Sequence, residues 1–226
     1  MAVHLQREIE NLKKEILTLC VMVEQSVHEA TLAIEKRDGV LAKNVIEKDL
    51  KVDQMEVKVE EACLKILALH QPVAVDLRFI IAVLKINNDL ERVGDLAVNI
   101  AERAAFLATQ PEVHISFDFV EMAHKTQEML KNSLDALVNF NAKLGREVCA
   151  SDDEIDAMNR QMFAIVQDVI HDHPDQTESL IHLLSASRHL ERIADLATNI
   201  AEDVIYMIEG EIVRHKTEEY RSQASD

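Results

Sequence analysis

Apolar residues recur every three or four positions through most of the chain, as in the series Leu12, Ile16, Leu19, Val23 and Val27. This spacing places apolar side chains along one face of an α-helix. The pattern is interrupted at six places, each holding a glycine or a proline: residues 36–39, 71–72, 110–111, 145, 173–174 and 210. Such residues end helices. The sequence therefore predicts six helices, most of them about 25–35 residues long and thus roughly 35–50 Å.

An internal repeat organises these segments. The thirteen residues that begin at Leu90 read LERVGDLAVNIAE, and the thirteen that begin at Leu190, 100 positions later, read LERIADLATNIAE. Ten of the thirteen are identical. One helix earlier, Asp49 and Asp53 are echoed by Asp152 and Asp156 at an offset of 103. Each half therefore carries three helices in the same order, which predicts an all-α fold of two tandem, pseudo-symmetric, antiparallel three-helix bundles.

We expect the first bundle over residues 1–110, the second over residues 111–210, and a polar tail over residues 211–226. The composition agrees with an all-α fold, because the chain has only four glycines and three prolines and no tryptophan. Its net charge of −17 disfavours direct binding to nucleic acid or to an anionic membrane surface. It favours cations or a basic partner surface instead.

The beginning of the chain has no signal-peptide pattern, and no apolar run approaches the roughly 20 residues that a membrane span needs. Cys20, Cys63 and Cys149 are odd in number and widely spaced, as expected for reduced thiols in the cytosol. These features predict a cytoplasmic protein.

Acidic residues form a stripe on the third helix of each half. At about 100° per residue, Glu91, Asp95, Asn99 and Glu102 fall within about 80° of one another, whereas Leu90, Val93, Ala97, Ile100 and Ala104 take the opposite side. The second half repeats the stripe with Glu191, Asp195, Asn199 and Glu202. On the second helix of the first half, Asp49, Asp53, Glu56 and Glu60 share one narrow face.

Carboxylates at positions i and i+4 repel by roughly 0.2–0.5 kcal/mol per pair on an exposed helix. This sequence nevertheless has two such pairs in each half: Asp49/Asp53 and Glu91/Asp95 in the first, and Asp152/Asp156 and Glu191/Asp195 in the second. The second and third helices of a bundle can face each other, so the two pairs can converge on a hard cation. Asn99 and Asn199 would then add oxygen ligands or hydrogen bonds. The residues predicted to hold metal are Asp49, Asp53, Glu91, Asp95, Asn99, Asp152, Asp156, Glu191, Asp195 and Asn199. The alternative is a solvated acidic face with Arg92 and Arg192 as counterions.

Motifs for other chemistry are weak. A ferritin-like di-iron site needs Glu-x-x-His from two helices, whereas this chain has one such motif, Glu121 with His124, and it has no echo. The sequence contains no P-loop, no dinucleotide-binding glycine motif, no nucleophile elbow and no HExxH. We therefore expect no enzymatic activity.

Several of these motifs together resemble a known family. The helix from Asn88 to Asp95 with Asn99, its copy from Arg188 to Asp195 with Asn199, the segment MEVKVEEAC that starts at Met55, and the turn QPVAVDLR that starts at Gln71 all resemble the PhoU family. The resemblance extends from about residue 5 to about residue 210. The second half departs from the pattern at Gln176 and Glu178, which stand where the first half has Asp76 and Arg78, and at Ala194, which stands where it has Gly94.

The resemblance implies two tandem three-helix bundles in a negative regulator of phosphate uptake and of the phosphate-starvation response. Members of this family couple a phosphate ABC transporter, through its ATPase subunit, to a sensor histidine kinase, and many are homodimers. Some bind iron or zinc through motifs that correspond to Asp49, Asp53, Glu91 and Asp95 in one half and to Asp152, Asp156, Glu191 and Asp195 in the other. A metal-binding structural or storage bundle remains the alternative function.

Overall fold

The computed structural model describes residues 2–113 and 115–210, and within these residues it has six α-helices and no strand. The helices are α1 (Ala2–Glu35), α2 (Gly39–His70), α3 (Ala74–Leu107), α4 (Phe119–Asn139), α5 (Ala142–Asp172) and α6 (Thr177–Glu209), and a short 3₁₀ turn η1 (Pro174–Gln176) precedes α6. The predicted all-α fold is confirmed. The predicted polar tail, 211–226, lies outside the described residues.

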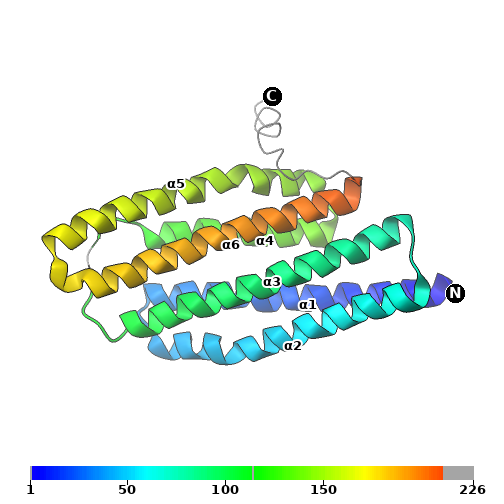
Figure 1. The fold of residues 1–226 in the computed structure, drawn as a ribbon, viewed down its shortest axis with the longest axis horizontal. Helices are drawn as coiled ribbons and strands as arrows, with labels where there is room; N and C mark the ends of the chain where they lie inside the picture. The colour runs from blue at the N-terminus through cyan, green and yellow to red at the C-terminus, as the bar shows by residue number, and fades with distance from the viewer. Residues whose placement is uncertain (1, 114, 211–226) are drawn as a thin grey trace.

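The helices form two bundles that lie side by side (Figure 1). Helices α1, α2 and α3 pack against one another, and so do α4, α5 and α6. The bundles meet where α3 packs against α6 and α1 against α4. Figure 1 shows α3 and α6 antiparallel in the middle of the molecule, with α2 and α5 at its two outer edges. The predicted architecture of two tandem, pseudo-symmetric bundles is thus confirmed.

One apolar core runs through both bundles and includes residues from all six helices. The core face predicted for α3 is buried as expected, with Leu90, Val93 and Ile100 fully inaccessible, and Leu190, Ile193 and Ile200 are buried in the same way on α6. Because α3 and α6 turn their apolar sides inward, the acidic stripe on each of them must point away from the core.

Most helix ends fall where the sequence predicts them. Asp38 caps α2, since its Oδ1 accepts hydrogen bonds from the backbone N–H groups of Val40 and Leu41. Gln71 and Gly210 end α2 and α6 in the left-handed conformation, with φ of 45° and 77°.

The predicted helix end at Gly145 is wrong. Helix α4 ends at Asn139 because Phe140 adopts the left-handed conformation (φ 51°), and Asn141 then caps α5 by accepting from the N–H of Leu144. Gly145 lies inside α5, where a Cβ atom would be 3.1 Å from Ile205 Cγ1 and 3.3 Å from the carbonyl oxygen of Ala201. This glycine therefore serves close packing of α5 on α6 rather than helix termination.

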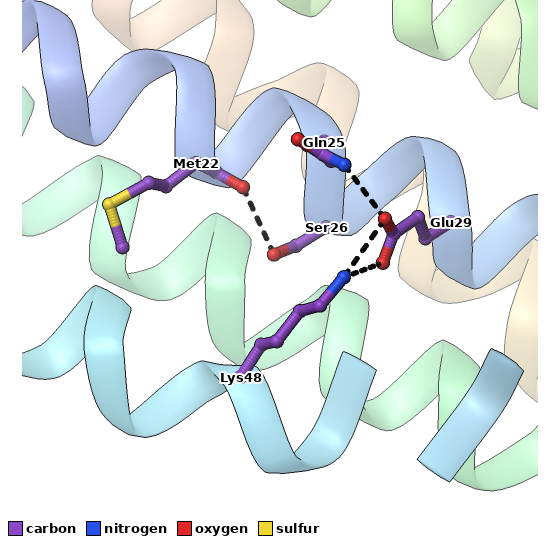
Figure 2. A network of polar contacts seen from close by, with 5 residues as sticks. All are labelled: Met22, Gln25, Ser26, Glu29 and Lys48. Carbon is purple, nitrogen blue, oxygen red and sulfur yellow. Dashed lines mark hydrogen bonds and ion pairs between the residues drawn. The ribbon is translucent and has the colours of Figure 1, made fainter. Parts of the chain in front are cut away.

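Polar contacts at the molecule's periphery hold α1 to α2. Figure 2 shows Glu29 of α1 accepting hydrogen bonds from Gln25 and from Lys48 of α2, whose Nζ lies 2.8 Å from Glu29 Oε2. Burial acts to raise the pKa of Glu29, but the hydrogen bonds from Lys48 and Gln25 outweigh it and keep that pKa below its usual value. Ser26 donates to the carbonyl oxygen of Met22 in the same region.

The seam between α3 and α6 differs at its two ends. At one end, Lys85 Nζ of α3 lies 2.9 Å from Asp203 Oδ1 of α6, and Asp203 is buried. At the other end, the rings of Phe106 and His182 stack with their centroids 3.8 Å apart. Both ends join the two halves, so the bundles form one packed unit.

In the described part of the chain, none of the helices combines the length and the apolar character that crossing a bilayer requires.

Two candidate acidic metal centres

The first acidic cluster lies where α2 faces α3. Burial, together with the nearby carboxylates of Asp53 and Asp95, raises the pKa of Asp49 to about 6. Burial also raises the pKa of Glu91, with further contributions from Asp95, Glu56, Asp53 and Asp49. These mutual effects require the side chains to be near one another. The structure therefore places Asp49, Asp53, Glu91 and Asp95 within electrostatic range of one another.

The second cluster lies at the equivalent place, between α5 and α6. Burial and the carboxylates of Asp195 and Asp156 raise the pKa of Asp152 to about 6, against the lowering effect of a hydrogen bond from Thr198. Burial raises the pKa of Glu191, with Asp156 the largest charge contribution, and it raises the pKa of Asp195, with Glu191 the largest. Asp152, Asp156, Glu191 and Asp195 thus form a group of their own.

The two clusters have different surroundings. Thr198 Oγ1 donates to Asp152 Oδ1 over 3.4 Å, whereas the position that corresponds to Thr198 in the first half is Val98. Arg192 lowers the pKa of Glu191 and of Asp195, in opposition to the acidic neighbours. The negative charge of the second cluster is therefore offset by Thr198 and Arg192 to a greater extent than the charge of the first cluster is offset by its neighbours.

Close helix packing sets the geometry of the first cluster. A Cβ atom on Gly94 would be 3.2 Å from Val52 Cγ1 and 3.5 Å from Asp49 Oδ1. The absence of a side chain at Gly94 therefore allows the backbone of α3 to approach the carboxylate of Asp49 on α2 closely. The equivalent Ala194 in the second half is likewise buried.

Asn99 and Asn199 lie on a shared groove rather than within the carboxylate clusters. The groove has a volume of about 300 Å³, lies along the α3–α6 seam, and is lined in pairs by Arg92, Asp95 and Asn99 and their equivalents Arg192, Asp195 and Asn199. The amide Nδ2 of Asn99 donates to the backbone carbonyl of Asp95 at 2.9 Å. Since Asp95 and Asp195 also belong to the clusters, the groove connects the two acidic sites across the molecule.

The structure adds Glu56 to the first cluster. Asn87, which is buried on α3, donates through Nδ2 to Glu56 Oε1 at 3.0 Å and to its backbone carbonyl at 3.1 Å. In the second half the equivalent residues form a single hydrogen bond, in which Ser187 Oγ donates to Asn159 Oδ1 at 3.1 Å. Glu56 shares a helix face with Asp53, which is visible in the sequence, and its contribution to the raised pKa of Glu91 identifies it as part of the first cluster.

The donor set suits a hard cation, because all its charged members are carboxylates. Their raised pKa values show that burial and mutual repulsion penalise the ionised form, a cost that a bound cation would remove. Among the described residues, however, no three His, Cys, Asp or Glu side chains are gathered closely enough to form a ready ligand set. The donor chemistry fits a metal ion, while the side chains do not by themselves enclose one.

Cysteines do not contribute to either cluster. Cys20, Cys63 and Cys149 are buried free thiols, and burial raises the pKa of each to about 12. They remain protonated at neutral pH, whereas a metal binds the thiolate.

The chain matches the model of the PhoU domain twice, over residues 16–104 and 119–204. It is 37% identical over 210 residues to a protein of Aquifex aeolicus named phosphate-specific transport system accessory protein PhoU homolog, a match that covers 93% of this chain and 95% of the relative. A homolog of the same name from Clostridium acetobutylicum is 34% identical over 92% of this chain and 95% of its own length.

Solved structures agree. The crystal structure of PhoU from Pseudomonas aeruginosa matches with a TM-score of 0.87 and 35% identity, over 91% of this chain and 99% of the other. The phosphate transport system regulatory protein PhoU from Streptococcus pneumoniae matches with a TM-score of 0.81 and 28% identity, over 92% of this chain and 99% of that structure. The two matched domains, the identities and the shared fold together place the chain in the PhoU family.

Proposed function

We propose that this protein is a negative regulator of phosphate uptake and of the phosphate-starvation response. The observation that carries the proposal is the match over more than nine-tenths of the chain to accessory proteins of the phosphate-specific transport system. In this proposal it acts by binding and not by catalysis. It works in the cytoplasm as a homodimer.

The proposed mechanism is that of an adaptor. It binds the ATPase subunit of a phosphate ABC transporter and a sensor histidine kinase, and it restrains the kinase while phosphate is plentiful. Two features support a binding role: a pair of bundles that share one apolar core and an acidic net charge that attracts basic partner surfaces.

Metal binding is the second part of the proposal. Iron or zinc would be held by Asp49, Asp53, Glu91 and Asp95 between α2 and α3, and by Asp152, Asp156, Glu191 and Asp195 between α5 and α6. A bound cation would neutralise each group of carboxylates and tie its two helices together. Asn99 and Asn199, which line the groove between the clusters, would supply hydrogen bonds at its walls.

Deletion of the gene tests the regulatory function. A reporter driven by a phosphate-starvation promoter is expected to become active in phosphate-rich medium, and a plasmid copy of the gene should silence it again. A plasmid copy carrying D49N and D152N, expressed at equal level, tests whether the acidic clusters take part. A reporter that stays silent in the deletion strain would rule out the regulatory function.

A structural or storage role for the metal is the alternative, favoured by the presence of two similar acidic clusters in one chain. Elemental analysis of the purified protein, with melting curves before and after chelation, separates the possibilities. A storage protein would take up many ions per chain with little change in melting temperature. A structural site would hold a fixed number and lose stability on their removal.

A further inference from the structure

Helix α2 carries a row of apolar side chains that the fold leaves uncovered. Leu50, Val57 and Leu64 are 63%, 49% and 52% exposed. They are seven residues apart, so they lie on one face of the helix, along a line of about 20 Å. We call these three residues the α2 apolar row.

The position of α2 explains why the row stays uncovered. Among the described elements, α2 packs only against α1 and α3, and it forms an outer edge of the molecule (Figure 1). Single exposed leucines are ordinary in soluble proteins. Three in heptad register on an edge helix form a line of apolar side chains about 10 Å apart, and a partner helix can place an apolar side chain against each of them.

The internal repeat provides a control inside the same molecule. Helix α5 is the other edge helix and is equivalent to α2 at an offset of 103, since buried Val52 and Val59 correspond to buried Ile155 and Met162. The positions equivalent to the α2 apolar row are Asp153, Arg160 and Gln167, which are all polar and all exposed. Folding of a three-helix bundle therefore does not require apolar residues at these positions, and only α2 has them.

The row is bordered by acidic side chains that form no ion pair among the described residues and, on the α1 side, by three lysines. Glu47, Asp53, Glu60 and Glu61 are exposed and lie next to the row on the helical wheel. On the α1 side, the adjacent row is Lys51, Lys58 and Lys65, of which Lys58 pairs with Glu15 and Lys65 with Glu8, each at 3.2 Å. On α5, the positions of Glu47, Glu60 and Glu61 are taken by Ala150, Phe163 and Ala164. The fourth acidic residue, Asp53, has an acidic equivalent on α5 in Asp156, so three of the four border residues are specific to α2.

We propose that the α2 apolar row is the docking site for an amphipathic helix of a partner protein, whose apolar ridge is flanked by lysine or arginine. The apolar ridge of the partner packs against Leu50, Val57 and Leu64, and its basic flanks pair with Glu47, Glu60 and Glu61. A second copy of this chain does not fit, because antiparallel pairing of two α2 helices about Val57 would place Glu61 of one copy opposite Asp53 of the other. The proposal stands apart from metal binding, since the row includes no residue of the acidic clusters.

A designed probe tests the surface directly. The probe is a fluorescently labelled peptide of three heptads, about 21 residues, with leucine at a and d and lysine at e and g. A second peptide has glutamate in place of lysine. Binding to the full-length protein is measured by fluorescence anisotropy. The test variant L50D/V57R/L64Q installs the residues of α5 and leaves the net charge unchanged, so it removes the apolar row without altering the overall attraction for a basic peptide.

The matched control is V120D/V138R/I181Q, which alters three other exposed apolar residues on α4 and α6 and also keeps the charge constant. Circular dichroism checks that both variants remain folded. The lysine peptide is expected to bind the parent and the control equally and the test variant at least about tenfold more weakly. The glutamate peptide is expected not to bind. A further variant, E47Q/E60Q/E61Q, should weaken binding and reduce its sensitivity to salt.

Two results overturn the proposal. One is equal affinity of the lysine peptide for the parent and for L50D/V57R/L64Q, which would mean that the peptide binds through charge elsewhere. The other is a change of oligomeric state by light scattering in this variant only, which would mean that a second copy of the chain covers the row. Neither result bears on the reporter experiment with the deletion strain, so this proposal and the regulatory function fail separately.

Discussion

Asp49 and Asp152 occupy the same place in the two halves and share the same unfavourable environment. Each is partly buried and faces carboxylates on its own helix and on the next, and each has its pKa raised to about 6. In the unfolded chain the pKa of an aspartate is about 4. The folded protein without a bound cation therefore pays for ionising these two residues at neutral pH.

Replacing Asp49 or Asp152 by asparagine should stabilise the metal-free protein at pH 7. We expect about 1 kcal/mol for each, after allowance for solvent screening of a partly exposed group, and an increase in melting temperature of about 2–4 °C. The measurement is thermal unfolding followed by circular dichroism in the presence of a chelator. E47Q on the exposed face of α2 is the control and should leave the melting temperature unchanged.

The sign of the pH dependence follows from the direction of the shift. Because the folded pKa is above the unfolded one, the folded state holds its proton more tightly, and stability is lost as pH rises from about 4 through about 6. The advantage of D49N over the parent should therefore be full above about pH 6 and vanish near pH 4. An advantage that persists at pH 4 would contradict an origin in ionisation.

The sequence predicts those features of the helices that depend on neighbouring residues. It does not predict the helix ends that depend on packing against another helix. The repeat and the apolar spacing predicted the number, order and burial of the helices, because both are properties of neighbouring residues. Gly145 was misread as a helix end because a glycine needed for close approach to Ala201 and Ile205 looks the same in sequence as one needed for a turn. Phe140, which does end α4, carries no local signal for the left-handed conformation.

The α3–α6 seam contains a charge pair in which the carboxylate is buried and the lysine is partly exposed. Lys85 is paired with Asp203, whose side chain is only 5% exposed. K85M removes the ammonium group that pairs with this nearly buried carboxylate, and we expect a loss of about 2 kcal/mol in the free energy of unfolding by denaturant titration. The double variant K85M/D203N should recover much of the loss because it removes the buried carboxylate charge together with the ammonium group.

An exposed ion pair provides the comparison for this experiment. Lys65 and Glu8 lie 3.2 Å apart between α1 and α2, with side chains 54% and 34% exposed. K65M should cost less than about 0.5 kcal/mol. An equal loss in the free energy of unfolding for K65M and K85M would mean that the burial of Asp203 does not determine the effect of K85M.

The two acidic clusters are joined by the seam between α3 and α6. Asp95 and Asp195 belong to different clusters yet line one groove together with Arg92 and Arg192. The sequence predicted that the clusters are equivalent, since the repeat places the same residues on the same helices. It did not predict that they approach each other across a shared groove, because this depends on how α3 and α6 pack, which no local pattern encodes.

Protons and metal ions compete for the same carboxylates, which gives a prediction for the intact protein. A metal ion binds the ionised form, and Asp49 and Asp152 become ionised only as pH rises through about 6. Saturating Zn²⁺ should therefore raise the melting temperature at pH 7.5 and have much less effect at pH 5. In the double variant D49N/D152N the increase at pH 7.5 should be largely lost, although this variant is the more stable one without metal. The reversal of rank between parent and variant on adding Zn²⁺ is the decisive measurement, because a purely structural acidic surface would keep the same order under both conditions.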